Sequence, residues 1–197
     1  VLLILLLRNR NLMEAVVMRI PDTICGRLSE VELAANFADA HPPLTHAQAV
    51  IEADRCFYCY DAPCVAACPT GIDIPKFIKA IATNNMHGAA HTILQSNILG
   101  GACARVCPTE ILCEGKCVHT VREEGQAIRI GALQRHATDW QMEHGGQPFA
   151  RGVATGKHVA GVGAGPAGLP CAHRLVMHGH DLDVLDARTL PGGFSAH

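Results

Sequence analysis

Residues 56–69 read CFYCYDAPCVAACP, and residues 103–117 read CARVCPTEILCEGKC. These two runs hold eight of the ten cysteines in the chain. The first run spaces its cysteines by two, four and three residues, the second by three, five and three, and each run contains a Cys-Pro pair. Crowding of this kind needs a chemical reason, which is either a set of disulfides or a metal site.

A metal site explains the two runs better than disulfides do. The sequence shows no secretory signal, and a chain of 197 residues can bury a core without cross-links. Iron–sulfur clusters are held by soft thiolates, and cysteines close together on a turn can reach neighbouring corners of one cube. Zinc is the alternative metal, although zinc sites usually come as separate Cys-x2-4-Cys pairs.

A further alternative is that the cysteines bind nothing and pack in the core. We interpret three of them in this way, as small buried hydrophobic residues: Cys25, Cys171 and Cys103. Seven candidate ligands then remain, whereas two cubes need eight. One ligand must therefore come from another type of residue.

The composition is that of a folded chain with little net charge. Apolar residues make up 49% of the sequence, which is enough for a core. The formal net charge of -2 supplies no positive field for a nucleic-acid backbone or an anionic membrane surface. We therefore expect neither nucleic acid nor a membrane as partner, and a cytoplasmic location.

The chain begins with an apolar run, Val1 to Leu7, followed by Arg8 and Arg10. Such a run is too short to span a bilayer, which takes about 20 residues. A signal peptide would carry its positive charge before the apolar stretch. Because the chain starts with Val, we interpret this run as a fragment edge or a mistranslated leader, with a genuine anchor as the alternative.

Most of the chain has the pattern of short helices. Apolar residues recur at helical spacing over 28–54, with a break at 41–43, and over 73–95, with an interruption near 84–85. We expect no alternating strand of any length before residue 156. The expected divisions are a leader of unclear status over 1–27, a helical iron–sulfur domain over 28–145, a linker over 146–156, and an α/β portion over 157–197.

The last part of the chain has the order of a βαβ unit. Apolar runs over 158–162 and 182–185 flank a helical stretch over 167–177, and the turn over 163–168 reads GAGPAG. In this context the GxGxxG pattern is typical of a dinucleotide-binding loop, whose glycines let the backbone approach a pyrophosphate at a helix N-terminus. Asp186 is expected to accept hydrogen bonds from ribose hydroxyls. The alternative is a turn that binds no nucleotide.

The candidate nucleotide-binding residues are Gly163, Gly165, Pro166, Ala167, Gly168, Asp186, Gly192 and Gly193.

Six segments carry a family resemblance. They are RCFYCYDAPC over 55–64, ACPT over 67–70, NILG over 97–100, ARVCPT over 104–109, LCE over 112–114 and IGALQR over 130–135. Together they resemble the N-terminal cluster domain of dihydropyrimidine dehydrogenases, above all the flavin-bearing subunits of the bacterial NAD-dependent form. The resemblance covers residues 28–197. It implies a mainly α chain: a helical ferredoxin-like domain with two [4Fe-4S] clusters, followed by the first βαβ part of a Rossmann-like FAD-binding domain.

Carried over by position, the resemblance implies two sets of cluster ligands. One set is Cys56, Cys59, Cys64 and Cys117. The other set is Cys68, Cys107, Cys113 and Gln134. The glutamine supplies the eighth ligand, and because its amide oxygen carries no charge, it removes one negative charge from the site and alters the potential. The alternative for Gln134 is an ordinary exposed glutamine on a helix.

The resemblance also implies a role in electron transfer for an NAD(P)-dependent oxidoreductase, with no catalytic residue in this chain. NAD(P)H would reduce FAD, and electrons would pass singly through the clusters to a partner subunit that carries FMN and reduces pyrimidines. The segment 61–64 and Gln134 favour this reading over the glutamate synthase small subunit, whose partner is the large subunit. A third alternative is a non-catalytic, truncated iron–sulfur module.

The chain ends at His197. In the family, the rest of the flavin domain and the whole nicotinamide domain would follow that residue. We therefore expect an incomplete FAD site without stoichiometric FAD, and a fragment that is inactive alone.

Overall fold

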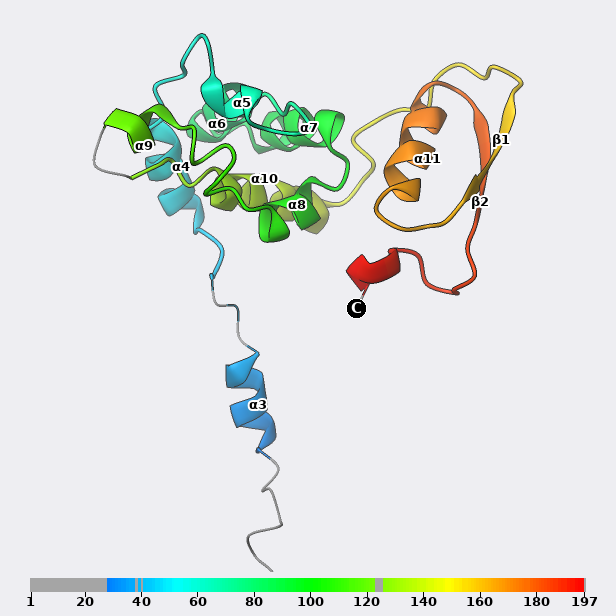
Figure 1. Ribbon diagram of the computed structural model, residues 1–197, viewed down its shortest axis with the longest axis horizontal. Helices are drawn as coiled ribbons and strands as arrows, with labels where there is room; N and C mark the ends of the chain where they lie inside the picture. Colours follow the sequence, from blue (N-terminus) through cyan, green and yellow to red (C-terminus); the bar gives the residue numbers. More distant parts are fainter. Residues whose placement is uncertain (1–27, 38, 40, 123–125, 197) are drawn as a thin grey trace, which may run out of the picture. The chain divides into compact units, whose positions relative to one another are not determined.

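The structure is a computed structural model that describes residues 28–37, 39, 41–122 and 126–196. The described residues form helices up to residue 144 and a two-stranded sheet after it (Figure 1). The helices of the first part are α3 (Glu30–Asn36), α4 (His46–Asp54), α5 (Pro63–Ala66), α6 (Ile74–Ala82), α7 (Met86–Ser96), α8 (Gly100–Val106), α9 (Val118–Arg122) and α10 (Ile130–His144). The second part consists of β1 (His158–Val162), α11 (Gly168–Met177), β2 (Asp181–Leu185) and the 3-10 turn η2 (Gly193–Ala196). The apolar run at the start, the expected leader and Cys25 lie outside the described residues.

The chain divides after Pro42 into two units, and α3 belongs to the first. This helix begins with a capping box, in which the Ser29 hydroxyl accepts from the Glu32 N–H and the Glu32 carboxylate accepts from the Ser29 N–H. None of its residues is buried. Residues 41–43 lie in neither helix nor strand, so the break expected there is confirmed.

The main helices of the second unit begin at side-chain caps. Thr45 caps α4, Asp73 caps α6 and Asn85 caps α7, each by accepting from the backbone N–H three residues on. Asn84 adopts a left-handed conformation with φ of 60°, which ends the helical path of α6 before α7 begins. The interruption predicted near 84–85 is therefore confirmed.

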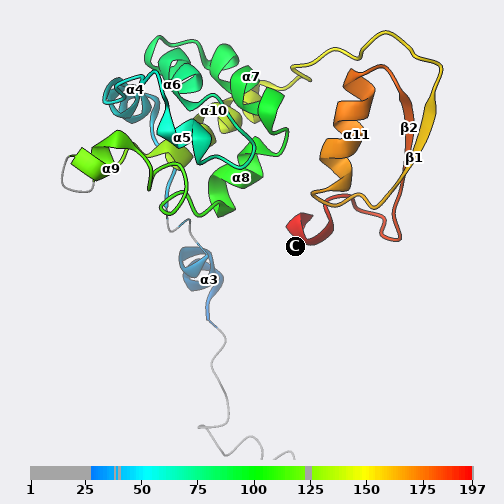
Figure 2. The same cartoon turned by 45° about the horizontal axis from the view of Figure 1, so that its top comes forward.

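The core lies where α4, α6, α7 and α10 pack together (Figure 2). Phe77, Ile78 and Ile81 occupy one face of α6 and are fully buried. Small and branched residues of the other helices complete the cluster: Ala49 and Ala53, Ala89 and Ile93, and Leu133 and Ala137. Burial of a side chain such as Phe77 stabilises the fold by about 1.5–3 kcal/mol.

The end of the described chain forms a βαβ unit. β1 and β2 pair in parallel, with Val159 opposite Leu182 and Val162 opposite Leu185, and α11 connects them. A parallel pair needs such a crossover, because its strands cannot be joined by a hairpin. The predicted order is confirmed, with α11 and β2 each starting within one residue of the expected position, and no strand precedes β1 among the described residues.

The described chain is thus mainly helical with a small parallel sheet, as the sequence predicts. None of the helices in its described ranges is long and apolar enough to cross a membrane.

Candidate functional site

Four cysteines assigned to one cluster line a single cavity of the helical part. They are Cys56, Cys59, Cys64 and Cys117. Three come from the first cysteine run, and Cys117 comes from the end of the second. The remaining wall is largely apolar, with Pro63, Ile74, Ile78, Ile128 and Ile130. The rings of Phe57 and His119 stack 4.2 Å apart at this cavity.

The loop of the first run has a constrained backbone. Tyr58 and Ala62 both take left-handed conformations, with φ of 51° and 34°. Non-glycine residues in such conformations cost of order 1–3 kcal/mol each and persist only where the surroundings hold them. The Tyr58 hydroxyl donates to the Ala53 carbonyl over 3.2 Å, and the Lys79 ammonium lies 4.9 Å from the Tyr58 ring centroid. These contacts anchor the loop that brings three cysteines to one cavity.

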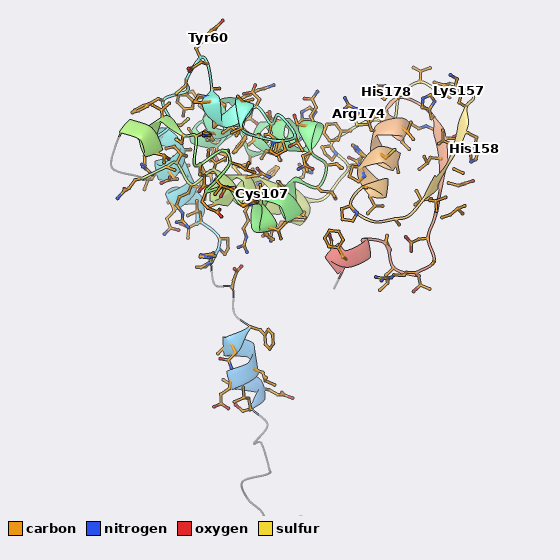
Figure 3. All side chains as sticks on the ribbon, viewed as in Figure 1. Tyr60, Cys107, Lys157, His158, Arg174 and His178 are labelled. Carbon is orange, nitrogen blue, oxygen red and sulfur yellow. The ribbon has the colours of Figure 1, made fainter. Side chains whose placement is uncertain are left out.

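The second set of predicted ligands lines a second cavity. Its donor side chains are Cys68, Cys103, Cys107, Cys113 and Gln134. Cys107, labelled in Figure 3, directly follows the last residue of α8. Ile74, the first residue of α6, lines both cavities, so the two sites adjoin each other.

Gln134 lies inside the protein. Its side chain is only 6% exposed, and its amide nitrogen donates to the Gly100 carbonyl over 2.8 Å. With the nitrogen held by α8, the amide oxygen is the polar atom that remains for the cavity. The alternative of an ordinary exposed glutamine is therefore wrong.

The second cysteine run is folded by its own backbone. The Thr109 carbonyl accepts from the N–H groups of Glu114 and Gly115. A Cβ at Gly115 would overlap the Glu110 carbonyl, so only glycine fits this turn. The Glu114 carboxylate accepts from the Gly131 N–H over 2.9 Å, which ties the run to the first turn of α10.

The glycine loop after β1 is closely packed. A Cβ at Gly168 would overlap the Gly163 carbonyl, so α11 can approach the loop only with glycine there. The Gly192 N–H donates to the Ala164 carbonyl over 2.7 Å. A Cβ at Gly193 would lie 3.0 Å from the Gly165 Cα. The structure therefore brings both predicted glycine segments together.

The remaining predicted nucleotide residues lie at the same loop. Pro166 packs beside Gly193, and Ala167 is the N-cap residue of α11. The Asp186 carboxylate accepts from the Ala164 N–H over 2.7 Å and from the Arg188 N–H over 2.8 Å. These hydrogen bonds hold the pKa of Asp186 below its usual value. Asp186 thus links the glycine loop to the end of β2, and its role toward a ribose stays a prediction.

Residues 33–146 match the protein family described as dihydropyrimidine dehydrogenase domain II, 4Fe-4S cluster. The chain belongs to this family. The matched range contains both cysteine runs and Gln134. Residues 162–197 match a second family, the NAD(P)-binding Rossmann-like domain, which covers the glycine loop.

Similar curated proteins are oxidoreductase subunits. The NAD-dependent dihydropyrimidine dehydrogenase subunit PreT of Escherichia coli (strain K12) is 43% identical over 153 residues, which are 78% of this chain and 37% of that protein. The PreT homolog of Salmonella typhi is 42% identical over 156 residues, 79% of this chain and 37% of that protein. The glutamate synthase (NADPH) small chain of E. coli (strain K12) is 39% identical over 158 residues, 80% of this chain and 33% of that protein. The chain thus spans just over a third of the length of the curated PreT relatives it matches.

Four thiols of this domain II site have raised pKa values. Burial raises the pKa of Cys64 to about 11 and that of Cys113 to about 12, with smaller contributions from neighbouring charges. Burial also raises the pKa of Cys56, and burial followed by the nearby Cys103 raises that of Cys107 to about 11. Because iron binds the thiolate, uptake of a cluster must offset this cost and release protons.

Cys68 differs from these four thiols, because its pKa is lowered. Burial raises its pKa, but hydrogen bonds from the Thr70 hydroxyl and from the N–H groups of Ile72, Thr70 and Gly71 outweigh burial, so its pKa is lowered. These groups stabilise a negative sulfur, which suits a thiolate ligand.

Each cavity offers the four donors that a cube needs. Over the described ranges, no group of three or more His, Cys, Asp or Glu side chains converges on a position for one metal ion. The donors are instead spread around the walls of two cavities, and in a cube each iron takes its own ligand. This arrangement suits the 4Fe-4S chemistry of the family.

Two of the cysteines interpreted as buried hydrophobic residues are not buried. Cys171 is exposed on α11, and Cys103 is half-buried and lines the second cavity. Sequence spacing missed the position of Cys103 because the cavity it lines also takes Cys68 and Cys113, which come from other segments of the chain. One usable signal was its separation of four residues from Cys107, which places both on one helical face.

Proposed function

We propose that this chain is the electron-transfer part of an NAD(P)H-dependent iron–sulfur flavoprotein oxidoreductase. In this proposal electrons pass from NAD(P)H through FAD and two [4Fe-4S] clusters to an FMN-containing partner subunit that reduces pyrimidines. The observation that carries the proposal is the pair of adjoining cavities, each lined by four donors of the predicted set and sharing Ile74.

The two donor sets are interleaved in sequence. Cys68 comes from the first run but lies at the second cavity, and Cys117 comes from the second run but lies at the first cavity. Bacterial ferredoxins that hold two clusters exchange a ligand between runs in the same manner. This exchange supports two clusters held by one folded unit, with Gln134 as the non-cysteine ligand of the second.

Two one-electron carriers suit the proposed reaction. A hydride from a nicotinamide carries two electrons, and conversion of uracil to dihydrouracil takes up two electrons and two protons. Bound clusters supply single-electron steps between these two-electron reactions. The protein residues would hold the clusters in a largely apolar surrounding, with Ile74 between them.

The glycine loop supports a dinucleotide at the other end of the path. Gly163, Gly165 and Gly168 lie in the turn at the start of α11. At Gly168 this turn has no room for a larger residue. Backbone N–H groups at a helix start favour a pyrophosphate. We assign FAD to this loop, and NAD(P)H to a separate site.

A pyrimidine-reducing partner is favoured over the alternative. Identity to the dihydropyrimidine dehydrogenase subunit PreT is 43%, against 39% to the glutamate synthase small chain. The DAPC segment at 61–64 and a glutamine at 134 also favour the first partner. The alternative, supply of electrons to a glutamate synthase large subunit, rests on the same site and differs only in the partner.

The first experiment counts iron. Anaerobic reconstitution of the chain should yield about eight irons and eight sulfides per molecule, as two cubes require. Four irons, or bound zinc in place of iron, would contradict the two-cluster proposal.

The second experiment identifies the partner. The reconstituted chain, reduced with dithionite and freed of excess reductant, is mixed with an FMN-containing pyrimidine-reducing subunit or with a glutamate synthase large subunit. In the mixture with the pyrimidine-reducing subunit, we expect added uracil to reoxidise the clusters, so that the visible absorbance of their oxidised form returns. Reoxidation only with glutamine and 2-oxoglutarate in the second mixture would favour the alternative.

A further inference from the structure

Helix α8 has little stability of its own. It spans seven residues and begins with Gly100 and Gly101, and among the described residues no side chain caps its first turn. A helix so short and with two glycines is marginal unless other elements hold it. Cys103 lies in α8 and Cys107 directly follows it, and both line the second cavity. The shape of that cavity therefore depends on how α8 is held.

Helix α10 holds the first turn of α8. The Gln134 amide donates to the Gly100 carbonyl over 2.8 Å. A Cβ at Gly101 would lie 3.6 Å from the Thr138 hydroxyl oxygen, so the two helices approach closely here. These contacts fix the start of α8 but not its end.

An ion pair holds the last turn of α8. The Arg105 guanidinium donates to both carboxylate oxygens of Asp139 on α10, over 2.8 and 3.0 Å, and to the Gly101 carbonyl over 2.9 Å. The Asp139 carboxylate also accepts from the Arg135 Nε over 3.3 Å. The Arg105 and Asp139 side chains are 37% and 22% exposed, so water screens this pair less than it screens a fully exposed one.

The ion pair joins the two segments that carry predicted ligands of the second cluster. Arg105 lies two residues before Cys107, and Asp139 lies five residues after Gln134 in the same helix. Cys107 and Gln134 both line the second cavity. The contact between Arg105 and Asp139 therefore limits how far these two predicted ligands can move apart.

We propose that Asp139 is a positioning residue of the second cluster site: through Arg105 it fixes the end of α8 on α10 and so keeps Cys107 at the cavity that Gln134 lines. This inference rests on the proposed two-cluster function. Neutralising Asp139 removes the negative charge that the guanidinium groups of both Arg105 and Arg135 contact, and two like charges near each other repel. The end of α8 would then be held less firmly.

The test measures iron release from the full chain after anaerobic reconstitution. Asp139→Asn removes the charge, Asp139→Glu keeps it, and Arg105→Gln removes the other half of the pair. Asp181→Asn is the matched control, because it breaks the 2.6 Å ion pair between Arg151 and Asp181 in the βαβ part. Release to a ferrous chelator is followed by absorbance, and electron paramagnetic resonance of the reduced chain shows which cluster is lost.

We expect each of these variants to take up about eight irons. Asp139→Asn should release about four of them roughly tenfold faster than the unsubstituted chain, and the resonance of one cluster should decay at the same rate. Arg105→Gln should change release in the same direction. Asp139→Glu should recover most of the original rate, and Asp181→Asn should leave the rate unchanged.

A second ion pair provides a reciprocal variant for the first cluster. The Glu52 carboxylate accepts from the Arg55 guanidinium over 2.7 Å and from the Arg129 N–H over 2.8 Å. Arg55 directly precedes Cys56, which lines the first cavity. Glu52→Gln should therefore speed the loss of a different resonance from the one that is lost in Asp139→Asn.

Several results would overturn the inference. Release from Asp139→Asn could match the control, or Asp139→Glu could release iron as fast as Asp139→Asn, which would make the charge irrelevant. Equal acceleration of both clusters in Asp139→Asn, or loss of the same resonance in Glu52→Gln, would indicate general loosening of the fold. If Asp139→Asn does not fold, Arg105→Gln provides the same test. Fewer than about eight irons in the unsubstituted chain would instead contradict the two proposed clusters.

Discussion

The side-chain amide of Gln134 on α10 donates a hydrogen bond to the carbonyl oxygen of Gly100, the first residue of α8. The bond joins two helices through residues that are 34 positions apart in sequence. Gln134 also lines the cavity that holds four thiols. The pairing of these two residues thus defines one side of the candidate second cluster site.

Substitution of Gln134 should affect one cluster only. Gln134→Ala removes both the amide oxygen and the bond to Gly100, so we expect the iron count to fall below about eight while the four irons of the first site remain. Gln141→Ala is the matched control, because Gln141 is a second buried amide on α10 and lines neither cysteine cavity. Equal iron in both variants would exclude Gln134 as a ligand.

Truncation of the core should destabilise the helical part strongly. Phe77 is fully buried between helices, so Phe77→Ala should lower the free energy of unfolding by about 3–5 kcal/mol. Phe37 is 85% exposed, so Phe37→Ala should change the free energy of unfolding by about 0.5 kcal/mol or less. Urea unfolding followed by circular dichroism measures both, and similar midpoints would contradict this account of the core.

The glycine loop should not tolerate a methyl group at Gly168. A Cβ there overlaps the Gly163 carbonyl, so Gly168→Ala must push α11 away from the loop. We expect faster amide hydrogen exchange in β1 and α11 for this variant. Gly161→Ala is the control, because its nearest neighbour would be the Asp183 carbonyl at 3.8 Å. Faster exchange in Gly161→Ala than in Gly168→Ala would contradict the close contact between Gly168 and the Gly163 carbonyl.

Asp186 should make the glycine loop sensitive to acid. Hydrogen bonds from the N–H groups of Ala164 and Arg188 lower its pKa in the folded chain, and the Arg188 charge acts in the same direction. The stabilisation is therefore present above the ordinary aspartate pKa of about 3.9 and is lost as the pH falls through the lowered folded value.

This acid dependence can be measured at a single amide. The Ala164 N–H resonance should titrate with a midpoint below about 3.9 in the unsubstituted chain and should not titrate in that range in Asp186→Asn. A midpoint at or above the ordinary value would contradict a carboxylate held by these two donors.

The helices and the βαβ unit were predictable because their signals are local. Thr45, Asp73 and Asn85 cap their own helices through backbone groups three residues away. The apolar positions of α6 recur at helical spacing, and the glycine loop lies between two strand-like runs. Each of these signals acts within a few residues of the element it defines.

The site was predictable only in part. The spacing of the cysteines indicated metal chemistry, and the family resemblance indicated how they divide into two sets. Spacing did not reveal that Cys103 lies among the second set or that Cys171 is exposed, because the burial of a small side chain depends on which element packs over it.

The sequence by itself therefore determined the element types, the two cysteine runs and the glycine loop of this chain. Tertiary structure decided which donors share a cavity, that Ile74 lies at both cavities, and that Gln134 is buried against Gly100. The physical reason is that proximity between α8 and α10 arises from packing of residues far apart in the chain, which no local pattern encodes.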